Sequence, residues 1–189
     1  EIAEMTQQDL NSVDAIAVAG GPGSFTGLRI SSATAKGLGL ALNKPLVHIP
    51  TLEGMACCLW GTDRVICPMM DARRDQVYTG IYEFVNDELN ILEDQMAVPV
   101  DEVAEHLNRI GRPVILTGDG VPVYLDRLEQ LLKVPFSCAP SHLNRQRAAA
   151  VAFRAMEYVR CGRIETADRH KPDYLRVSQA EREREERIK

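Results

Sequence analysis

The chain has 189 residues, of which 45% are hydrophobic and 26% charged, so it can bury a core either as one large domain or as two small lobes. Its formal net charge of −5 argues against non-specific binding of nucleic acid, which requires clustered Lys and Arg. No apolar run approaches the roughly 20 residues of a membrane span, and neither end is typical of a secretory signal.

The first 63 residues alternate expected strands with expected helices. The chain opens with Glu1 and not with Met, so we expect part of the natural N-terminus to be missing, and residues 1–10 read as the end of a helix or a connector. The alternation favours a mainly parallel sheet covered by helices. The expected strands are 14–19 and 46–49, and the expected helices are 26–42 and 51–60.

A glycine-rich turn joins the first of these strands to the first helix. Gly20, Gly21 and Gly23 permit positive φ or close backbone approach, and Ser24 or Thr26 can cap the helix. The turn lacks the Lys-Ser/Thr of a P-loop, and its glycines are spaced one residue too wide for a dinucleotide fingerprint. We therefore favour a structural tight turn over a phosphate site.

The helix expected over 26–42 carries two rows of small residues. Ala33, Gly37 and Ala41 recur at every fourth position, and Ala35 with Gly39 forms a second row. A glycine inside a helix costs about 1 kcal/mol relative to alanine, so two of them indicate that another backbone comes close. That backbone belongs either to a strand of the same domain or to a helix of another subunit, and the sequence leaves both open.

A second lobe is expected to begin at residue 64 and to end at 176. A charged tail over 177–189 follows, expected to be solvated or a fraying helix. Apolar and β-branched runs predict strands, and helical spacing predicts the remaining helices. Strands are expected at 65–70, 76–84 and 113–117, with a hairpin loop at 71–75, and helices at 100–110, 123–132 and 145–160.

Candidate catalytic residues are sparse. The four histidines are scattered without an i, i+4 pair for zinc, and His48 reads as a satisfied strand-end residue. Glu53 reads as a carboxylate at the positive end of a helix, and Gly118-Asp119-Gly120 as a tight turn that could also let a nucleotide base lie close. We expect no catalytic and no metal-binding residue. The odd number of cysteines, without C-x-x-C spacing, predicts buried thiols in a reducing cytoplasm: Cys57, Cys58, Cys67, Cys138 and Cys161.

Four motifs occur in order along the chain: the segment 21–29 preceded by 14–18, the stretch 51–56, the hairpin 71–73 and the closing 172–176. Together they resemble a known family, the TsaB (YeaZ) family, in which they have the same order, and the glycine-rich one is specific. The resemblance covers the chain up to Arg176. It implies an α/β, two-lobed fold of the actin, Hsp70 and sugar-kinase type (ASKHA, ribonuclease H-like), whose usual N-terminal strand hairpin would lie upstream of Glu1.

The resemblance also implies a function. Members of the family are non-catalytic partners of TsaD, which transfers a threonylcarbamoyl group to the adenosine beside the anticodon of tRNA. The implied partners are TsaD in a heterodimer, the ATPase TsaE in a ternary complex, and a second copy in a homodimer, with tRNA reached only through the complex. No cofactor is expected on this chain alone, and ATP or ADP at an interface of the complex is left open.

Two departures from the catalytic relatives point to a pseudo-enzyme. TsaD-like proteins carry the metal-binding motif His-x-Glu-Gly-His, but here Thr51 and Met55 stand at the histidine positions, and a thioether is a poor ligand in a nitrogen and oxygen site. The Asp-x-Gly hairpin that wraps a phosphate in this fold class has Ala72 and Arg73 instead of a glycine neighbourhood, which hinders backbone approach.

In this family the helices of the first lobe pack against the partner. The resemblance therefore implies two sets of functional residues: the interface residues Arg29, Ala33, Lys36, Gly37 and Leu40, and the signature loop Gly21, Pro22, Gly23, Ser24, Phe25, Thr26 and Gly27. The alternatives are an active glycoprotease-like metallopeptidase or nucleotide-dependent transferase, and a dimeric binding module of actin-like fold with another partner.

Overall fold

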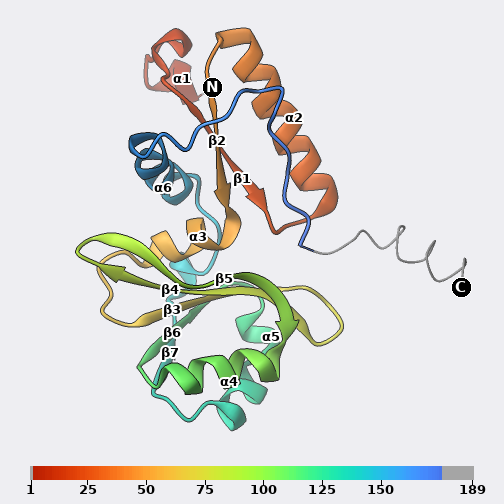
Figure 1. Ribbon diagram of the computed structural model, residues 1–189, viewed down its shortest axis with the longest axis vertical. Coiled ribbons are helices and arrows are strands. Elements are labelled where there is room, and N and C mark those ends of the chain that lie inside the picture. Colours follow the sequence, from red (N-terminus) through yellow and green to blue (C-terminus); the bar gives the residue numbers. More distant parts are fainter. Residues whose placement is uncertain (1, 176–189) are drawn as a thin grey trace, which may run out of the picture.

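The computed structural model describes residues 2–175 and divides into two lobes with helix α3 between them (Figure 1). The upper lobe in Figure 1 holds a parallel pair of strands and the two longest helices. The charged tail expected over 177–189 lies outside the described residues. The elements of this lobe are α1 (Ile2–Met5), η1 (Leu10–Ser12), β1 (Ile16–Gly21), α2 (Phe25–Leu42), β2 (Leu46–Pro50), α3 (Thr51–Ala56), η2 (Cys57–Leu59) and α6 (Ala148–Arg160).

Helices cover both faces of the β1–β2 pair. The strands align with Ile16 opposite Leu46 and Val18 opposite His48, and because side chains alternate along a strand, each face has its own small core. The core on the α2 side consists of Val18, Ala35, Leu46 and Ala167. The core on the α6 side consists of Val47, Ile49, Ala155 and Tyr158.

The position of α6 corrects the sequence analysis. Chain order predicts that the helix expected at 145–160 belongs to the second lobe, but the helix packs against β1, β2 and α3. Its apolar face meets the free face of β2 through Ala155 and Tyr158. Order along the chain cannot reveal this return, because the 80 or so residues of the other lobe lie between β2 and α6.

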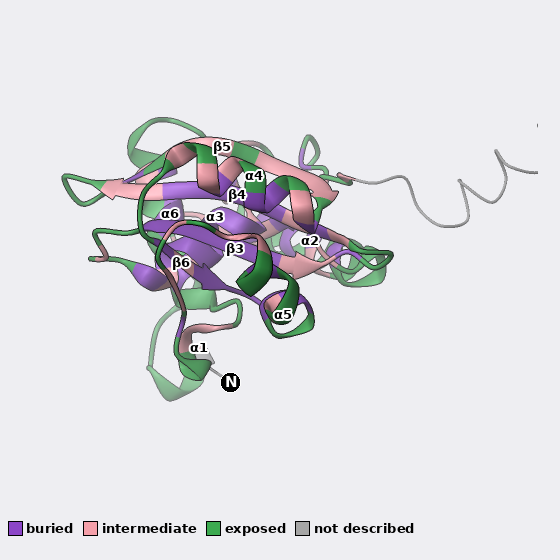
Figure 2. Ribbon diagram, turned by 90° about the horizontal axis from the view of Figure 1, so that it is seen from below, coloured by how far each residue is buried: buried purple, intermediate pink, exposed green. Residues whose placement is uncertain are grey.

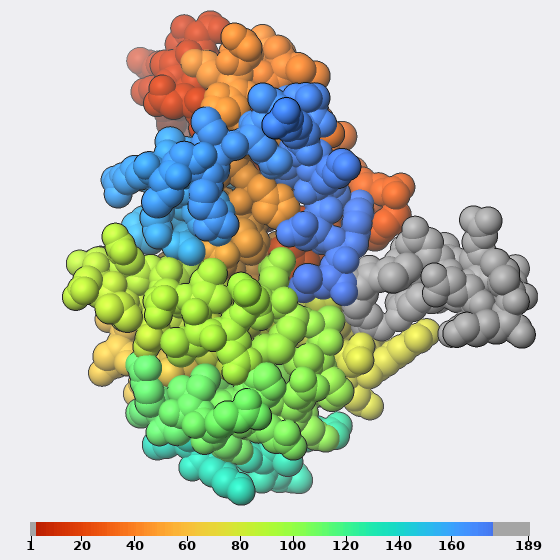
Figure 3. Space-filling view, in the orientation of Figure 1, coloured from red at the N-terminus to blue at the C-terminus, as the bar shows by residue number. Residues whose placement is uncertain are grey.

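After α6 the chain stays with the first lobe as an irregular strap, defined here as residues 165–174. Glu165 and Leu46 exchange two backbone hydrogen bonds of 2.8 and 2.9 Å, and the N–H of Asp173 donates to the carbonyl of Gly20 at 2.7 Å. The strap thus bridges the start of β2 and the end of β1. It is visible as the dark blue band beside the orange α2 in Figure 3.

The second lobe is a five-stranded mixed sheet in the order β5-β4-β3-β6-β7. Strands β3, β4 and β5 are antiparallel neighbours, and β3, β6 and β7 are parallel. The interior strands and α3 stand out as buried in Figure 2. The elements are β3 (Val65–Asp71), β4 (Gln76–Val85), β5 (Glu88–Pro99), α4 (Val100–Ile110), β6 (Val114–Thr117), α5 (Val121–Leu131), β7 (Phe136–Cys138) and η3 (Ser141–Leu143).

Alternation along β3 distributes its residues between two cores. Val65, Cys67 and Met69 face helices α4 and α5, whereas Ile66 joins Leu52 and Met55 of α3. Helix α3 is therefore packed between the two lobes. Across the described residues, no helix combines the length and the apolar character needed to cross a bilayer.

Candidate functional site on the exposed face of helix α2

The glycine-rich turn before α2 is held from inside the chain. Gly21 has a φ of 134°, and a Cβ at this position would lie 2.2 Å from the backbone oxygen of Asp173. Ser24 is the N-cap, and its hydroxyl accepts a hydrogen bond from the N–H of Gly27 at 3.4 Å. These contacts give the turn a structural role. Along the signature loop, Gly21 and Pro22 are buried, Gly23 is half-buried, and the rest is exposed: Ser24, Phe25, Thr26 and Gly27.

Helix α2 separates its two rows of small residues onto opposite faces. Ala35 and Gly39 form the inner row, where a Cβ on Gly39 would lie 2.5 Å from Leu46 Cδ1. Ala33 and Gly37 belong to the exposed row, and a Cβ on Gly37 would meet no described atom within 4 Å. A strand of the same lobe therefore explains the inner row and leaves the outer row without a partner among residues 2–175.

The outer row lies in an exposed apolar face. Leu40 and Ile30 have 70% and 63% of their surface exposed. Burial of such an apolar side chain in an interface would contribute about 1.5–3 kcal/mol of favourable free energy. We call this surface the α2 face; it consists of Ile30, Ala33, Gly37, Leu40 and Ala41.

The two charged residues of the expected interface flank the α2 face and contact other parts of the lobe. Arg29 lies over the ring of Phe25, 4.0 Å from its centroid, and its Nε donates to the hydroxyl of Tyr174 at 3.4 Å. Lys36 is half-buried, and its Nζ donates to the backbone oxygen of Asp168 at 3.5 Å. All five expected residues thus lie on α2. Arg29 contacts the first residue of this helix and the strap, and Lys36 contacts the strap.

The stretch 51–55, which stands where TsaD-like proteins have a metal motif, is buried in the junction between the lobes. The carboxylate of Glu53 accepts hydrogen bonds from Arg154 Nε at 2.6 Å and from the hydroxyl of Tyr158 at 2.9 and 3.0 Å. Glu53 and Arg154 are only 4% and 3% exposed. Sequence position predicts only a helix-end role for Glu53 and does not reveal this ion pair; the available signal is Arg154, a charged residue inside an alanine-rich stretch of α6.

Burial and charge act in opposite directions on this cluster. Burial disfavours the charged guanidinium of Arg154, but the charges and hydrogen bonds of Glu53 and Glu157 together outweigh it, so the pKa of Arg154 is raised. Burial, and then the negative charge of Glu53, raises the pKa of Tyr158 to about 12. Tyr158 therefore remains a hydrogen-bond donor at neutral pH, and the cluster acts as a fixed link between α3 and α6.

The two turns of the second lobe are also accounted for by internal contacts. Asp71 accepts from the N–H of Arg73 at 2.9 Å and from the hydroxyl of Tyr124 at 3.3 Å, and its Oδ2 lies 3.6 Å from Nη1 of Arg73. A Cβ on Gly118 would lie 2.1 Å from the carbonyl oxygen of Met69, and the N–H of Gly120 donates to that oxygen at 3.0 Å. These glycines are explained by their close approach to β3.

The cysteines are less uniformly buried than expected. Cys57 and Cys67 are buried, and burial raises the pKa of each thiol to about 12, which agrees with inert core thiols. Cys58 is half-buried, whereas Cys138 and Cys161 are exposed.

This difference predicts the pattern of alkylation. In the folded protein, iodoacetamide at pH 8 should modify Cys161 and Cys138 and leave Cys57 and Cys67 unmodified, because only an accessible thiolate reacts. Peptide mass spectrometry gives the occupancy at each site, with the protein in guanidinium as the reference in which all five react. Fast labelling of Cys67 without denaturant would contradict the packing of β3.

Comparison with known proteins places the chain in a family. The family model described as TsaD, tRNA N6-adenosine threonylcarbamoyltransferase, matches residues 1–183. The chain therefore belongs to the TsaD-like family.

Individual relatives of the chain show to which branch of the TsaD-like family it belongs. TsaB of Bacillus subtilis, a tRNA threonylcarbamoyladenosine biosynthesis protein, is 34% identical over 94% of this chain and 75% of its own length. TsaB of Escherichia coli is 31% identical over 67% of this chain and 56% of its own length. A Pseudomonas aeruginosa crystal structure described as similar to peptidase YeaZ superposes with a TM-score of 0.79 at 26% identity, covering 93% of this chain and 79% of that one. These relatives put the chain in the TsaB (YeaZ) branch and support the ASKHA-like fold.

Proposed function

We propose that this chain is a non-catalytic scaffold and activating subunit in tRNA threonylcarbamoyladenosine biosynthesis that dimerises with TsaD through the α2 face. The observation that carries the proposal is the open surrounding of Gly37. A glycine that weakens a helix, and whose Cβ position is free of contacts with residues 2–175, is explained by a second backbone that approaches from outside. Exposed apolar neighbours such as Ile30 and Leu40 supply the area that such contact would bury.

The lack of catalysis by this chain is inferred from what occupies the relevant positions. Thr51 and Met55 replace the two histidines of the TsaD motif, and the carboxylate of Glu53 is already bound by Arg154 and Tyr158. The hairpin at Ala72 and Arg73 is closed by contacts to Asp71. Both features support a subunit that acts by binding its partner, without nucleotide or metal chemistry of its own in these two places.

The remaining parts of the proposal concern the assembly. TsaE joins the heterodimer as the ATPase, and a homodimer would use the same α2 face and so compete with TsaD. The net charge of −5 favours contact with tRNA through the complex. We assign no nucleotide to the isolated chain, leave ATP or ADP to an interface of the complex, and place the protein in the cytoplasm, where the tRNA substrate is.

Reconstitution tests the proposed function. TsaD, TsaE, tRNA and an activated threonylcarbamoyl donor are mixed with and without this protein, and the modified nucleoside is measured by mass spectrometry after digestion. We expect modification only in the complete mixture and none when TsaD is replaced by a variant without its metal-binding histidines. Equal modification in the absence of this chain would contradict the proposal.

A further inference from the structure

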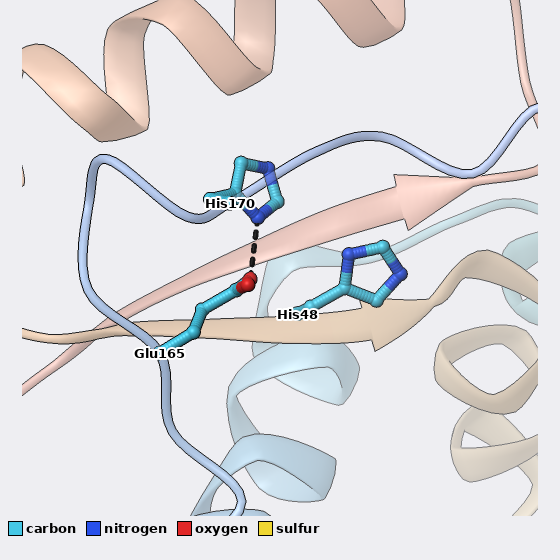
Figure 4. A group of neighbouring side chains, drawn as sticks. All are labelled: His48, Glu165 and His170. Atoms are coloured by element: carbon cyan, nitrogen blue, oxygen red, sulfur yellow. Dashed lines mark hydrogen bonds and ion pairs between the residues drawn. The ribbon is translucent and has the colours of Figure 1, made fainter.

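Three side chains outside the α2 face converge between β2 and the strap. His48 comes from β2, and Glu165 and His170 come from the strap (Figure 4). One nitrogen of each imidazole and one carboxylate oxygen of Glu165 all lie within 4.8 Å of one another. Figure 4 shows the carboxylate of Glu165 turned toward His170, with the ring of His48 beside this pair.

His170 is fully buried, with none of its surface exposed. Its Nδ1 lies 2.6 Å from Oε1 of Glu165, and its Nε2 has no hydrogen-bond partner among the described residues. The Nδ1 edge of the buried ring faces Glu165, so Nδ1 is the atom that His170 would offer to a ligand shared with that carboxylate.

The ring of His48 is held in a fixed orientation beside this pair. Its Nε2 lies 3.1 Å from Oδ2 of Asp173, and a Cβ on Gly20 would lie 1.9 Å from its Cε1, so the ring rests on the bare backbone of β1. The rings of His48 and His170 have centroids 5.6 Å apart. A histidine with a carboxylate on one nitrogen and its other nitrogen turned to further donors is the usual arrangement of a metal ligand.

We propose that His48, Glu165 and His170 bind a divalent transition metal, with Zn²⁺ as the best match, and that Asp173 orients His48. Two imidazole nitrogens and one carboxylate are a recurrent Zn²⁺ ligand set that leaves a fourth position for water. Mg²⁺ and Ca²⁺ prefer oxygen ligands only. Tetrahedral Zn²⁺ places its ligand atoms about 3.3 Å apart, a value inside the range from 2.6 Å to 4.8 Å found here.

Such a metal would fasten the strap to β2. Backbone hydrogen bonds of Glu165 and Asp173 already hold the two ends of the strap on β2 and β1. The metal would add a side-chain link from the strap to His48 of β2. The site shares no residue with the stretch 51–55. Sequence spacing predicts no metal ligand here, because residues 48, 165 and 170 have no recognisable spacing and meet only when the strap returns to the sheet.

Metal titration of the chelator-treated protein tests the inference. We expect ZnCl₂ to bind with one equivalent by calorimetry, and CoCl₂ to give the intense visible absorption of a four-coordinate site. His48→Gln and Glu165→Gln should each weaken binding by about 100-fold or more, since even an outer partner of a ligand is worth 10–100-fold. His142→Gln, at an exposed histidine of η3, is the matched control and should bind as the wild type does.

The assay uses this protein alone, so its outcome is independent of binding to TsaD. Less than one tight equivalent of Zn²⁺ in the wild type would overturn the inference, and so would full affinity in both variants. Thermal melting without metal shows whether each variant is folded. One folded ligand variant is sufficient to test whether the mutated side chain binds the metal. Adding ZnCl₂ should raise the melting midpoint of the wild type and of His142→Gln, and leave that of the two ligand variants unchanged.

Discussion

Replacing Glu53 by alanine should lower the free energy of unfolding by about 3–5 kcal/mol, because it leaves the guanidinium of Arg154 buried without its main partner. Both side chains are more than nine-tenths buried, and their shortest contact is 2.6 Å. The hydroxyl of Tyr158 loses its acceptor in the same change. Urea denaturation followed by circular dichroism gives the free energy and, from an unchanged slope, shows that the unfolding transition is the same.

A surface ion pair of the same length provides the control. Arg127 and Asp101 also approach to 2.6 Å, but both side chains are about half exposed, so Asp101→Ala should change the stability little. The double variant Glu53→Leu/Arg154→Met should be more stable than Glu53→Ala, because it removes both buried charges together. If Glu53→Ala and Asp101→Ala lower the free energy of unfolding by the same small amount, burial of the Glu53–Arg154 pair does not increase the cost of breaking it.

Gly37→Leu should abolish association with TsaD at micromolar concentrations without unfolding the chain. The Cβ of the new side chain would meet no described atom within 4 Å, and leucine suits a helix better than glycine, so the free energy of unfolding should stay the same or rise by about 0.5–1 kcal/mol. A bulky side chain at the centre of the α2 face would keep the partner backbone away. Calorimetric titration with TsaD should show a dissociation constant raised at least about 30-fold, which corresponds to the 2 kcal/mol of an interface hot spot.

The other glycine of the same helix is the matched control. Gly39→Ala adds a Cβ that would lie 2.5 Å from Leu46 Cδ1 and 3.1 Å from the carbonyl oxygen of Lys44, so it should destabilise the lobe. Gly37→Ala, with the same chemistry and no neighbour, should be neutral or stabilising. If Gly37→Leu binds TsaD with wild-type affinity, the α2 face is not the interface. This conclusion holds whatever the free energy of unfolding of the variant is.

Most elements of the fold were predicted from periodicity and turn chemistry. Helix 26–42 and strand 76–84 correspond to α2 and β4 with small changes at their ends. Strand β5 was missed because Glu, Asn and Asp, which are poor strand formers, interrupt its apolar residues, and its pairing with β4 overrides that preference. Strand β7, at three residues, is too short to give a periodic signal.

The candidate site was predicted only where its residues are close in sequence. The row of Ala33 and Gly37 could be identified from four-residue spacing, but its exposure depended on which face of α2 meets the sheet. Glu53 and Arg154 are 101 positions apart, and His48 and His170 are 122 apart by their numbers. Such pairs depend on the return of the chain to its first lobe, and no local pattern records that return.

This return also orders events during synthesis. The second lobe, from β3 to β7, is complete before α6 and the strap have been made, whereas the first lobe still lacks one covering helix at that moment. Domains generally fold as units as they leave the ribosome. The portion of the chain made in the middle should therefore fold first, and the lobe that contains the earliest residues should close only when the last ones emerge.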